Sequence, residues 1–275
     1  MLDTQRDETS PLPYRQLLVW KIVLDRTAAF FLLLPGLPFI GLLMLLVRLT
    51  SRGPAIYRQV RVGKGGRTFT MYKLRSMRLD AEAGTGPVWA GTGADSRVTP
   101  VGYWLRRLHL DELPQLINVL KGEMSLVGPR PERPEFVAVL AEKLPGYLDR
   151  VTILPGITGL AQVNLPPDTD LDSVRRKLVL DREYAASANL LLDLRIIICT
   201  SLRVFGIKGG RSVRLLSLHR TVTIPLESSQ PSDHVLLPTS TESIAAAAPH
   251  ILVATPHHKN GDSTIGRRYA VAPQR

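Results

Sequence analysis

Residues 27–47 read TAAFFLLLPGLPFIGLLMLLV, an uncharged run of 21 residues. A helix needs about 20 apolar residues to cross the hydrocarbon core of a bilayer, so this run is long enough. The alternative is a buried core helix, but few helices of soluble proteins are apolar on every side over this length. The residues before the run are polar and of mixed charge, which is not typical of a signal peptide. We therefore expect a polar segment over 1–16 and a membrane segment over 17–50.

Two features of this segment favour a helix that enters one leaflet and returns to the same side. Pro35 and Pro38 lie near its middle, and proline kinks a helix because it removes a backbone donor and clashes with the preceding turn. Basic residues flank the run at both ends, and basic flanks favour the cytoplasmic side. The flanking residues are Arg15, Lys21 and Arg26 before the run and Arg48, Arg52, Arg58, Arg61 and Lys64 after it. We expect a re-entrant helix with its break near Pro38, and a plain crossing is the alternative.

The composition of the 275-residue chain favours an anionic partner. Lys and Arg together number 35 against 24 Asp and Glu, which gives a formal net charge of +11. The single cysteine, Cys199, excludes an intrachain disulfide framework and a cysteine-based zinc cluster. Aromatic residues make up only 6% of the chain, which argues against a stacking platform for single-stranded nucleic acid. Anionic lipid or a phosphorylated substrate is therefore expected, with a membrane-tethered nucleic-acid binder as a rival that no motif supports.

Beyond the membrane segment, the pattern predicts short strands and helices. Residues 55–62 and 68–77 alternate apolar and polar residues around a glycine-rich turn, which is typical of a strand pair. Helices are expected from Asp111 and over 132–144, 173–188 and 190–205, the last suiting either a membrane interface or a core. The expected fold is α+β and membrane-associated, with a small mixed α/β catalytic region over 51–210 and amphipathic interfacial helices. Residues 211–275 are expected to form a disordered tail, because Ser, Pro, Thr, Ala and His dominate there.

Acidic and basic residues gather in a few short segments of the predicted catalytic region. Asp111 and Glu112 lie at a predicted helix start, where acids also serve simply to offset the helix dipole. Arg130 lies between two prolines, which fix its backbone, and rigid cations suit phosphate oxygens. The other basic candidates are Lys73, Arg75, Arg106 and Arg107. Because Mg²⁺ binds one or two carboxylates together with substrate phosphates, we expect a magnesium site at Asp111 and Glu112. One carboxylate could hold the metal while the other attacks phosphorus.

Several motifs together resemble one family, the small monotopic phosphoglycosyl transferases among the bacterial sugar transferases. The resemblance extends over roughly residues 21–210, and the set of motifs is far more specific than any one of them. The matching stretches are GPAIYRQ (53–59), FTMYKLRSM (69–77), VTPVG (98–102), LRR (105–107), LDELPQLINVLKG (110–122), MSLVGPRPE (124–132), PGITGLAQ (155–162) and LDL (192–194). Three positions depart from the family pattern. His109 replaces a serine before the acidic pair, Leu37 replaces one before Pro38, and Ile22 stands where a basic residue commonly follows the lysine.

The resemblance implies a mechanism and a set of partners. The aspartate that matches Asp111 would attack the phosphorus of a nucleoside-diphosphate sugar, usually a UDP-sugar, and release UMP. A polyprenyl phosphate, usually undecaprenyl phosphate, would then take the phosphosugar from the enzyme. Glu112 would help to hold Mg²⁺ and Arg130 would bind phosphate, while Gln115 and Asn118 are nearby substrate-binding candidates. The helix break of the family would lie at Pro38.

These expectations define an enzyme of the bacterial inner (cytoplasmic) membrane, with its catalytic region on the cytoplasmic face. It would perform the first membrane step in assembling an exopolysaccharide, a capsule, an O-antigen or a glycoprotein glycan. Membrane lipid is an expected partner and nucleic acid is not, and the sequence leaves open the transferred sugar and whether the chain forms a homo-oligomer. The alternative function is a catalytically silent membrane scaffold of a glycan assembly complex.

Overall fold

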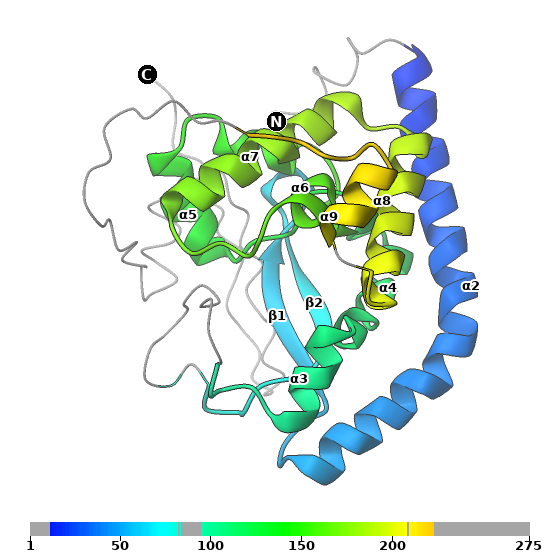
Figure 1. Cartoon of the computed structure of the whole chain (residues 1–275), viewed down its shortest axis with the longest axis vertical. Coiled ribbons are helices and arrows are strands. Elements are labelled where there is room, and N and C mark those ends of the chain that lie inside the picture. The colour runs from blue at the N-terminus through cyan, green and yellow to red at the C-terminus, as the bar shows by residue number, and fades with distance from the viewer. Residues whose placement is uncertain (1–11, 82, 84–94, 208, 223–275) are drawn as a thin grey trace, which may run out of the picture.

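The computed structural model describes residues 12–81, 83, 95–207 and 209–222. One long helix, α2 (Leu12–Thr50), runs along one side of the molecule, and the other elements lie on its concave side (Figure 1). Its part from Val19 to Thr50 is long and apolar enough to cross a membrane, with a mean hydropathy of 2.5. Only 22% of its apolar window is buried inside the structure, which favours membrane association over a soluble core helix.

The helix α2 continues through both prolines and bends along its length (Figure 1). The helix is therefore continuous at Pro38, where we expected a break. A kink of this kind follows from proline, which lacks the backbone donor but fits a helix that curves. The side chains of α2 that pack on the rest of the chain recur at helical spacing. They are Ala29, Leu33, Ile40, Leu43 and Val47, and all are buried.

The strand pair expected after the membrane segment is confirmed. Strands β1 (Ile56–Val62) and β2 (Thr68–Leu74) pair antiparallel, with Ile56 opposite Leu74 and Val62 opposite Thr68. The turn η1 (Lys64–Gly66) joins them, and Gly65 and Gly66 adopt positive φ angles of 66° and 75°, which glycine tolerates without a steric cost. A second, parallel pair is formed by β3 (Ser125–Val127) and β4 (Gly156–Thr158).

Short helices connect and cover these strands. They are α3 (Pro100–Arg107), η2 (Leu110–Glu112), α4 (Gln115–Lys121), α5 (Pro134–Lys143), η3 (Tyr147–Val151) and α6 (Leu160–Asn164). The helix that we expected to begin at Asp111 begins at Gln115 instead, and the acidic pair lies on the separate turn η2. Pro114 separates the two, since proline is well placed at a helix start but cannot donate into a preceding turn.

The C-terminal part of the described chain comprises α7 (Leu171–Ser187), α8 (Leu190–Val204) and α9 (Gly209–Leu215). Helix α8 has a buried side and an exposed side: Ile196 and Cys199 are fully buried, whereas Leu191 and Leu194 are exposed. Its buried side is part of the core, and a membrane interface for its exposed side stays a prediction. The expected boundary at residue 210 is too early. Helix α9 and the residues after it pack on the core, with Leu218 fully buried, because these residues still include regularly placed apolar side chains. The remaining tail, 223–275, lies outside the described residues.

Candidate active site

The acidic pair lies on a tight turn rather than on a regular helix. His109 adopts a left-handed backbone conformation with φ of 54°, and the 3₁₀ turn η2 follows it immediately. Non-glycine residues visit this region rarely, so His109 reverses the chain between α3 and η2 at some backbone cost. The turn leaves Asp111 only 7% exposed. Both carboxylates therefore leave bulk water without being part of a helix interior.

Glu112 is held by two cations from distant parts of the chain. Its Oε1 accepts hydrogen bonds from Lys73 Nζ on β2 at 2.9 Å and from Arg130 Nη2 at 2.7 Å. Burial alone would raise the pKa of Glu112, but Arg130 and Lys73 hold that pKa well below its usual range. Burial, together with the positive charge of Arg130, lowers the pKa of Lys73 to about 8. Glu112 is thus an ionised carboxylate whose charge is matched and whose position is fixed.

Asp111 is in a different electrostatic state from its neighbour. It forms no hydrogen bond or ion pair with any residue that the structure describes. Burial and the negative charge of Glu112 raise the pKa of Asp111, although Lys73, Arg106 and Arg130 oppose that shift. A desolvated carboxylate without hydrogen bonds has its lone pairs free for a new bond, which is what a nucleophile requires. The two acids therefore suit two different tasks.

The loop that carries Arg130 is fixed along its whole backbone. Four consecutive carbonyl oxygens, from Pro129 to Glu132, each accept a hydrogen bond. The donors are Gly156 N–H to Pro129 O (2.9 Å), Arg150 Nη2 to Arg130 O (2.8 Å), Arg61 Nη1 to Pro131 O (3.0 Å) and Val62 N–H to Glu132 O (2.9 Å). Two prolines already restrict this backbone. The guanidinium of Arg130 is thus presented from a rigid support, and a fixed cation needs little reorganisation when a phosphate arrives.

Buried ion pairs lie behind this loop, and sequence reasoning missed them. Arg150 is 2.9 Å from Asp181 Oδ2 and donates to the hydroxyl of Tyr147 at 2.7 Å. Glu132, the last residue of the loop, pairs with Lys177 at 3.0 Å and with Arg61. Glu132 belongs to the motif MSLVGPRPE (124–132), but Arg150 and Lys177 resemble ordinary surface charges in the sequence. Only their partners, 31 and 45 residues away along the chain, reveal a structural role.

The structure brings together Lys73, Arg106, Asp111, Glu112 and Arg130, but it places two predicted cations elsewhere. Arg106 donates to Ser76 Oγ at 2.8 Å while its charge still acts on Asp111. Arg75 instead donates to the carbonyl and hydroxyl oxygens of Ser51, just beyond the end of α2. Arg107 stacks over the ring of Trp104 at 5.3 Å on the outer face of α3. Arg75 and Arg107 therefore lie apart from the charged cluster around Glu112, and phosphate binding by either stays a prediction.

The two amide candidates also differ in their environments. Asn118 is fully buried and bonds to the edge of β2, donating to Thr70 O at 2.7 Å and accepting from Tyr72 N–H at 3.2 Å. The amide of Asn118 thus stabilises the edge of the strand, and a contact of Asn118 with substrate stays a prediction. Gln115 is 1% exposed, and its Nε2 has no hydrogen-bond partner among the described residues. A buried, unsatisfied donor near the acidic turn remains a candidate for substrate contact.

The donor set at this site limits how a metal could be held. No group of three or more His, Cys, Asp or Glu side chains suited to a metal occurs in the described part of the chain. Asp111 and Glu112 provide two carboxylates, and Oε1 of Glu112 is already engaged by two cations. This set does not form a protein cage for a metal. It fits Mg²⁺ that brings most of its coordination shell from water and substrate phosphates.

Comparison with known proteins covers the same region. The family model described as "Bacterial sugar transferase" matches residues 16–206. An undecaprenyl-phosphate glucose phosphotransferase of Komagataeibacter xylinus is 43% identical over 190 residues, which cover 66% of this chain and 35% of the relative. A putative undecaprenyl-phosphate N-acetylgalactosaminyl 1-phosphate transferase of Bacillus subtilis is 51% identical over 131 residues, 48% of this chain and 72% of the relative. A UDP-glucose:undecaprenyl-phosphate glucose-1-phosphate transferase of Caulobacter vibrioides is 42% identical over 192 residues, 69% of this chain and 71% of the relative. The matched region thus spans only about a third of the first of these relatives and most of the other two.

Proposed function

The chain belongs to the bacterial sugar transferase family, and on that premise we propose that it transfers a sugar-1-phosphate from a nucleoside-diphosphate sugar to a polyprenyl phosphate. The names of its relatives support a UDP-sugar as donor and undecaprenyl phosphate as acceptor. The observation that carries the proposal is the contrast within the acidic pair. Asp111 is buried without a hydrogen bond to the described residues, beside a glutamate that two cations hold ionised.

The proposed reaction has two displacements at one phosphorus. An Asp111 oxygen attacks the phosphorus that bears the sugar, and the bond from that phosphorus to the bridging oxygen breaks. The nucleoside monophosphate leaves with the electron pair, and the phosphosugar remains on Asp111 as an acyl phosphate. An oxygen of the polyprenyl phosphate then attacks the same phosphorus and restores the Asp111 carboxylate. The product is a polyprenyl-diphosphate sugar.

The neighbouring groups have distinct roles in this proposal. Arg130 and Lys73 neutralise the phosphate oxygens from fixed positions, while Glu112 keeps both cations directed at the site. Glu112 and Asp111 would hold Mg²⁺, which when bound supplies positive charge to the departing phosphate. Arg106 adds a further positive charge near Asp111. The buried Gln115 amide would donate to the donor substrate.

The proposal is tested by UMP release from a panel of UDP-sugars, using detergent-solubilised protein with Mg²⁺ and undecaprenyl phosphate. We expect acceptor-dependent UMP release with one or a few sugars, which would identify the reaction class and the donor together. A folded protein that releases no nucleoside monophosphate from UDP-, GDP- or CDP-sugars would contradict the proposal. That result would favour the catalytically silent scaffold.

The pKa of Lys73 predicts an alkaline limit to activity. Lys73 is cationic below its pKa of about 8 and neutral above it, so its contact with an anionic donor weakens as the pH rises through that value. We expect kcat/KM for the donor, which reports the free enzyme, to fall above pH of about 8. Lys73→Arg should move this alkaline limb to higher pH, because arginine stays protonated. An unchanged limb in Lys73→Arg would show that another group titrates.

We further propose that α2 enters the inner membrane from the cytoplasmic side and returns to it. Support comes from contacts near both ends of the helix with one and the same globular region. Near the start, Lys21 Nζ lies 2.6 Å from Asp193 on α8, and near the end, Arg75 donates to the Ser51 carbonyl at 2.9 Å. A helix that crossed the bilayer would place these two ends on opposite sides of it. One globular region could not then bind both.

Labelling of single-cysteine variants tests this topology. Trp20 and Arg52 are exposed near the two ends of α2, and the native Cys199 is fully buried, which limits background labelling. We expect a membrane-impermeant maleimide to modify Trp20→Cys and Arg52→Cys from the same side of sealed vesicles. Arg176→Cys, exposed on α7, marks the side of the globular region. Modification of the two helix positions from opposite sides would refute the re-entrant arrangement.

A further inference from the structure

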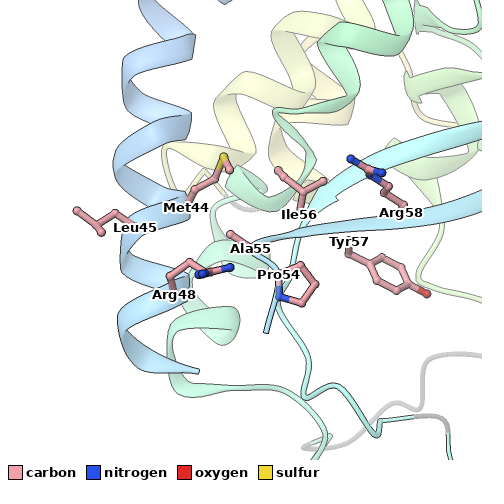
Figure 2. Close-up of a pocket in the computed structure, with 8 residues that line it drawn as sticks. All are labelled: Met44, Leu45, Arg48, Pro54, Ala55, Ile56, Tyr57 and Arg58. Atoms are coloured by element: carbon pink, nitrogen blue, oxygen red, sulfur yellow. The ribbon is translucent and has the colours of Figure 1, made fainter. Parts of the chain in front are cut away.

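The β1–β2 hairpin turns one of its faces towards the acidic turn. Side chains alternate between the two faces of a strand, so Tyr57 and Gln59 of β1 share a face with Lys73 of β2, which lies directly opposite Tyr57. Lys73 donates to Glu112 at 2.9 Å, so this is the face that borders the charged cluster. Figure 2 shows that Arg58 projects to the other side of β1 from Tyr57. The proposed chemistry assigns no role to Tyr57 or Gln59.

The amide of Gln59 has a fixed orientation on this face. Its Oε1 accepts two hydrogen bonds from Arg61, from Nε at 3.0 Å and from Nη2 at 2.6 Å. A guanidinium can only donate, so these contacts also identify which atom of the amide is the oxygen. Arg61 is itself held, because its Nη1 donates to the Pro131 carbonyl at 3.0 Å. Nε2 of Gln59 forms no hydrogen bond with the described residues, which leaves two N–H groups for a ligand.

Tyr57 adds an aromatic surface next to this amide. It lies two residues before Gln59 on the same face, and it is 41% exposed. Its Cβ lies about 4.5–5.5 Å from that of Lys73, as in any directly opposed pair. An exposed ring beside oriented donors is a combination with which proteins bind nucleobases, because the ring stacks on the base while polar groups read its edge. The hairpin face therefore presents both elements beside a cation that borders the acidic pair.

The position of this face suits the nucleoside of the donor. In the proposed reaction Lys73 and Arg130 hold the phosphate groups, and the nucleoside extends from the phosphate that leaves. Both cations contact Glu112, so phosphate bound there lies next to the hairpin face. Arg61, on the other side of Gln59, is bonded to the loop that carries Arg130. Gln59 thus lies between the two segments that provide the phosphate-binding cations.

We propose that Tyr57 and Gln59 form a nucleobase subsite, in which the base stacks on the ring of Tyr57 and a base carbonyl accepts a hydrogen bond from Nε2 of Gln59. This inference rests on the proposed function and names the residues that read the nucleotide. It also predicts a preference. Both exocyclic groups of uracil are carbonyls, whereas cytosine and guanine each have one carbonyl and one amine, and adenine has no carbonyl. We therefore expect the affinity for UDP to be highest and that for ADP to be lowest.

The test measures the binding of free nucleoside diphosphates to the full chain in detergent by titration calorimetry. Tyr57→Leu should weaken UDP binding by roughly tenfold, the scale of a lost base–aromatic contact, whereas Tyr57→Phe should keep it. Gln59→Glu retains an acceptor for Arg61 but has no N–H to donate, so the preference for UDP over ADP should fall by roughly tenfold. The added negative charge affects every nucleotide alike and therefore cancels in this ratio.

Two substitutions outside the subsite are the controls. Tyr103→Leu removes a tyrosine that is 55% exposed on α3, and Arg58→Gln removes a charge that is exposed on the opposite face of β1. Neither should change the affinity for UDP. In the transfer assay, Tyr57→Leu should raise KM for the UDP-sugar with little change in kcat, because the base is bound equally in the ground state and in the transition state.

The outcomes separate the subsite from the reaction. An active protein whose Tyr57→Leu and Gln59→Glu variants keep the wild-type affinity and selectivity would overturn the inference alone. Equal weakening of UDP, ADP and inorganic pyrophosphate binding in these variants would also overturn it, since the two residues would then act on the phosphates. Selective UDP binding that depends on both residues, in a protein that releases no UMP, would support the subsite and contradict the proposed transfer.

Discussion

Replacement of Asp111 by asparagine is expected to reduce sugar-phosphate transfer by at least ~10³-fold, the scale typical for loss of a nucleophile. The amide keeps the shape of the side chain but cannot form the acyl phosphate. The protein should not lose stability. Because the pKa of Asp111 is raised by burial and by Glu112, its ionised form costs folding free energy above that pKa, and the neutral amide removes this cost. Thermal unfolding in detergent should therefore occur at the same or a higher temperature.

The assay for Asp111→Asn is acceptor-dependent UMP release, measured together with the melting temperature. Asp172→Asn provides the control, because Asp172 is an exposed carboxylate on α7 whose only described ion pair is with Arg175. That variant should retain full activity. Near-normal turnover by Asp111→Asn would remove Asp111 from the role of nucleophile. Loss of activity accompanied by unfolding would also contradict the expected result, because the asparagine variant should keep an intact fold.

Replacement of Arg150 by methionine is expected to lower the free energy of unfolding by about 3–5 kcal/mol, the usual result of removing one partner from a buried ion pair. The side chain of Arg150 is 4% exposed and that of its partner Asp181 is 3% exposed. The change also removes the hydrogen bond to the Arg130 carbonyl, at 2.8 Å, which supports the loop between the two prolines. KM for the donor should therefore rise by roughly tenfold as Arg130 loses its fixed position.

A second substitution separates stability from positioning. In Arg150→Met combined with Asp181→Leu, no charge is left unpaired, so most of the lost stability should return. The donor KM should stay high, since the Arg130 carbonyl still lacks its partner. The control is Arg175→Met, which breaks an exposed Arg–Asp pair on α7 and should cost less than about 1 kcal/mol. Recovery of both stability and KM in the double variant would limit Arg150 to a purely structural role.

The parts of the site that follow from local sequence were predictable. The acidic pair, Lys73 and Arg130 all lie on short motifs, and the structure brings the four together. The positions of two predicted cations, Arg75 and Arg107, were not predictable, because they depend on the direction in which each side chain points. Arg75 lies two residues after Lys73, and residues at this spacing point to the same face of a strand. Because β2 ends at Leu74, this alternation of side chains does not extend to Arg75. Arg107 adjoins Arg106 on a helix, where neighbours point about 100° apart.

The buried ion pairs were not predicted for a different reason. Buried ion pairs join residues that are distant in sequence, so neither partner has a local signature. Arg150 and Asp181, on η3 and α7, are of this kind. The contact of Asn118 with β2 was not predicted either, because its position close to Gln115 in the sequence suggested chemistry, whereas its amide bonds to the open edge of β2. The strand pair, by contrast, was evident from alternation and glycine alone.

Contacts near both ends of α2 fix the position of the globular region relative to the helix. Lys21 and the Ser51 carbonyl are each bonded to the globular region. The helix and the acidic turn must therefore move as one rigid body. In the proposed re-entrant arrangement, the depth of α2 in the leaflet would then set the height of Asp111 above the hydrocarbon. Membrane thickness, which shifts that depth, would then influence how far the phosphate of the proposed lipid acceptor must reach.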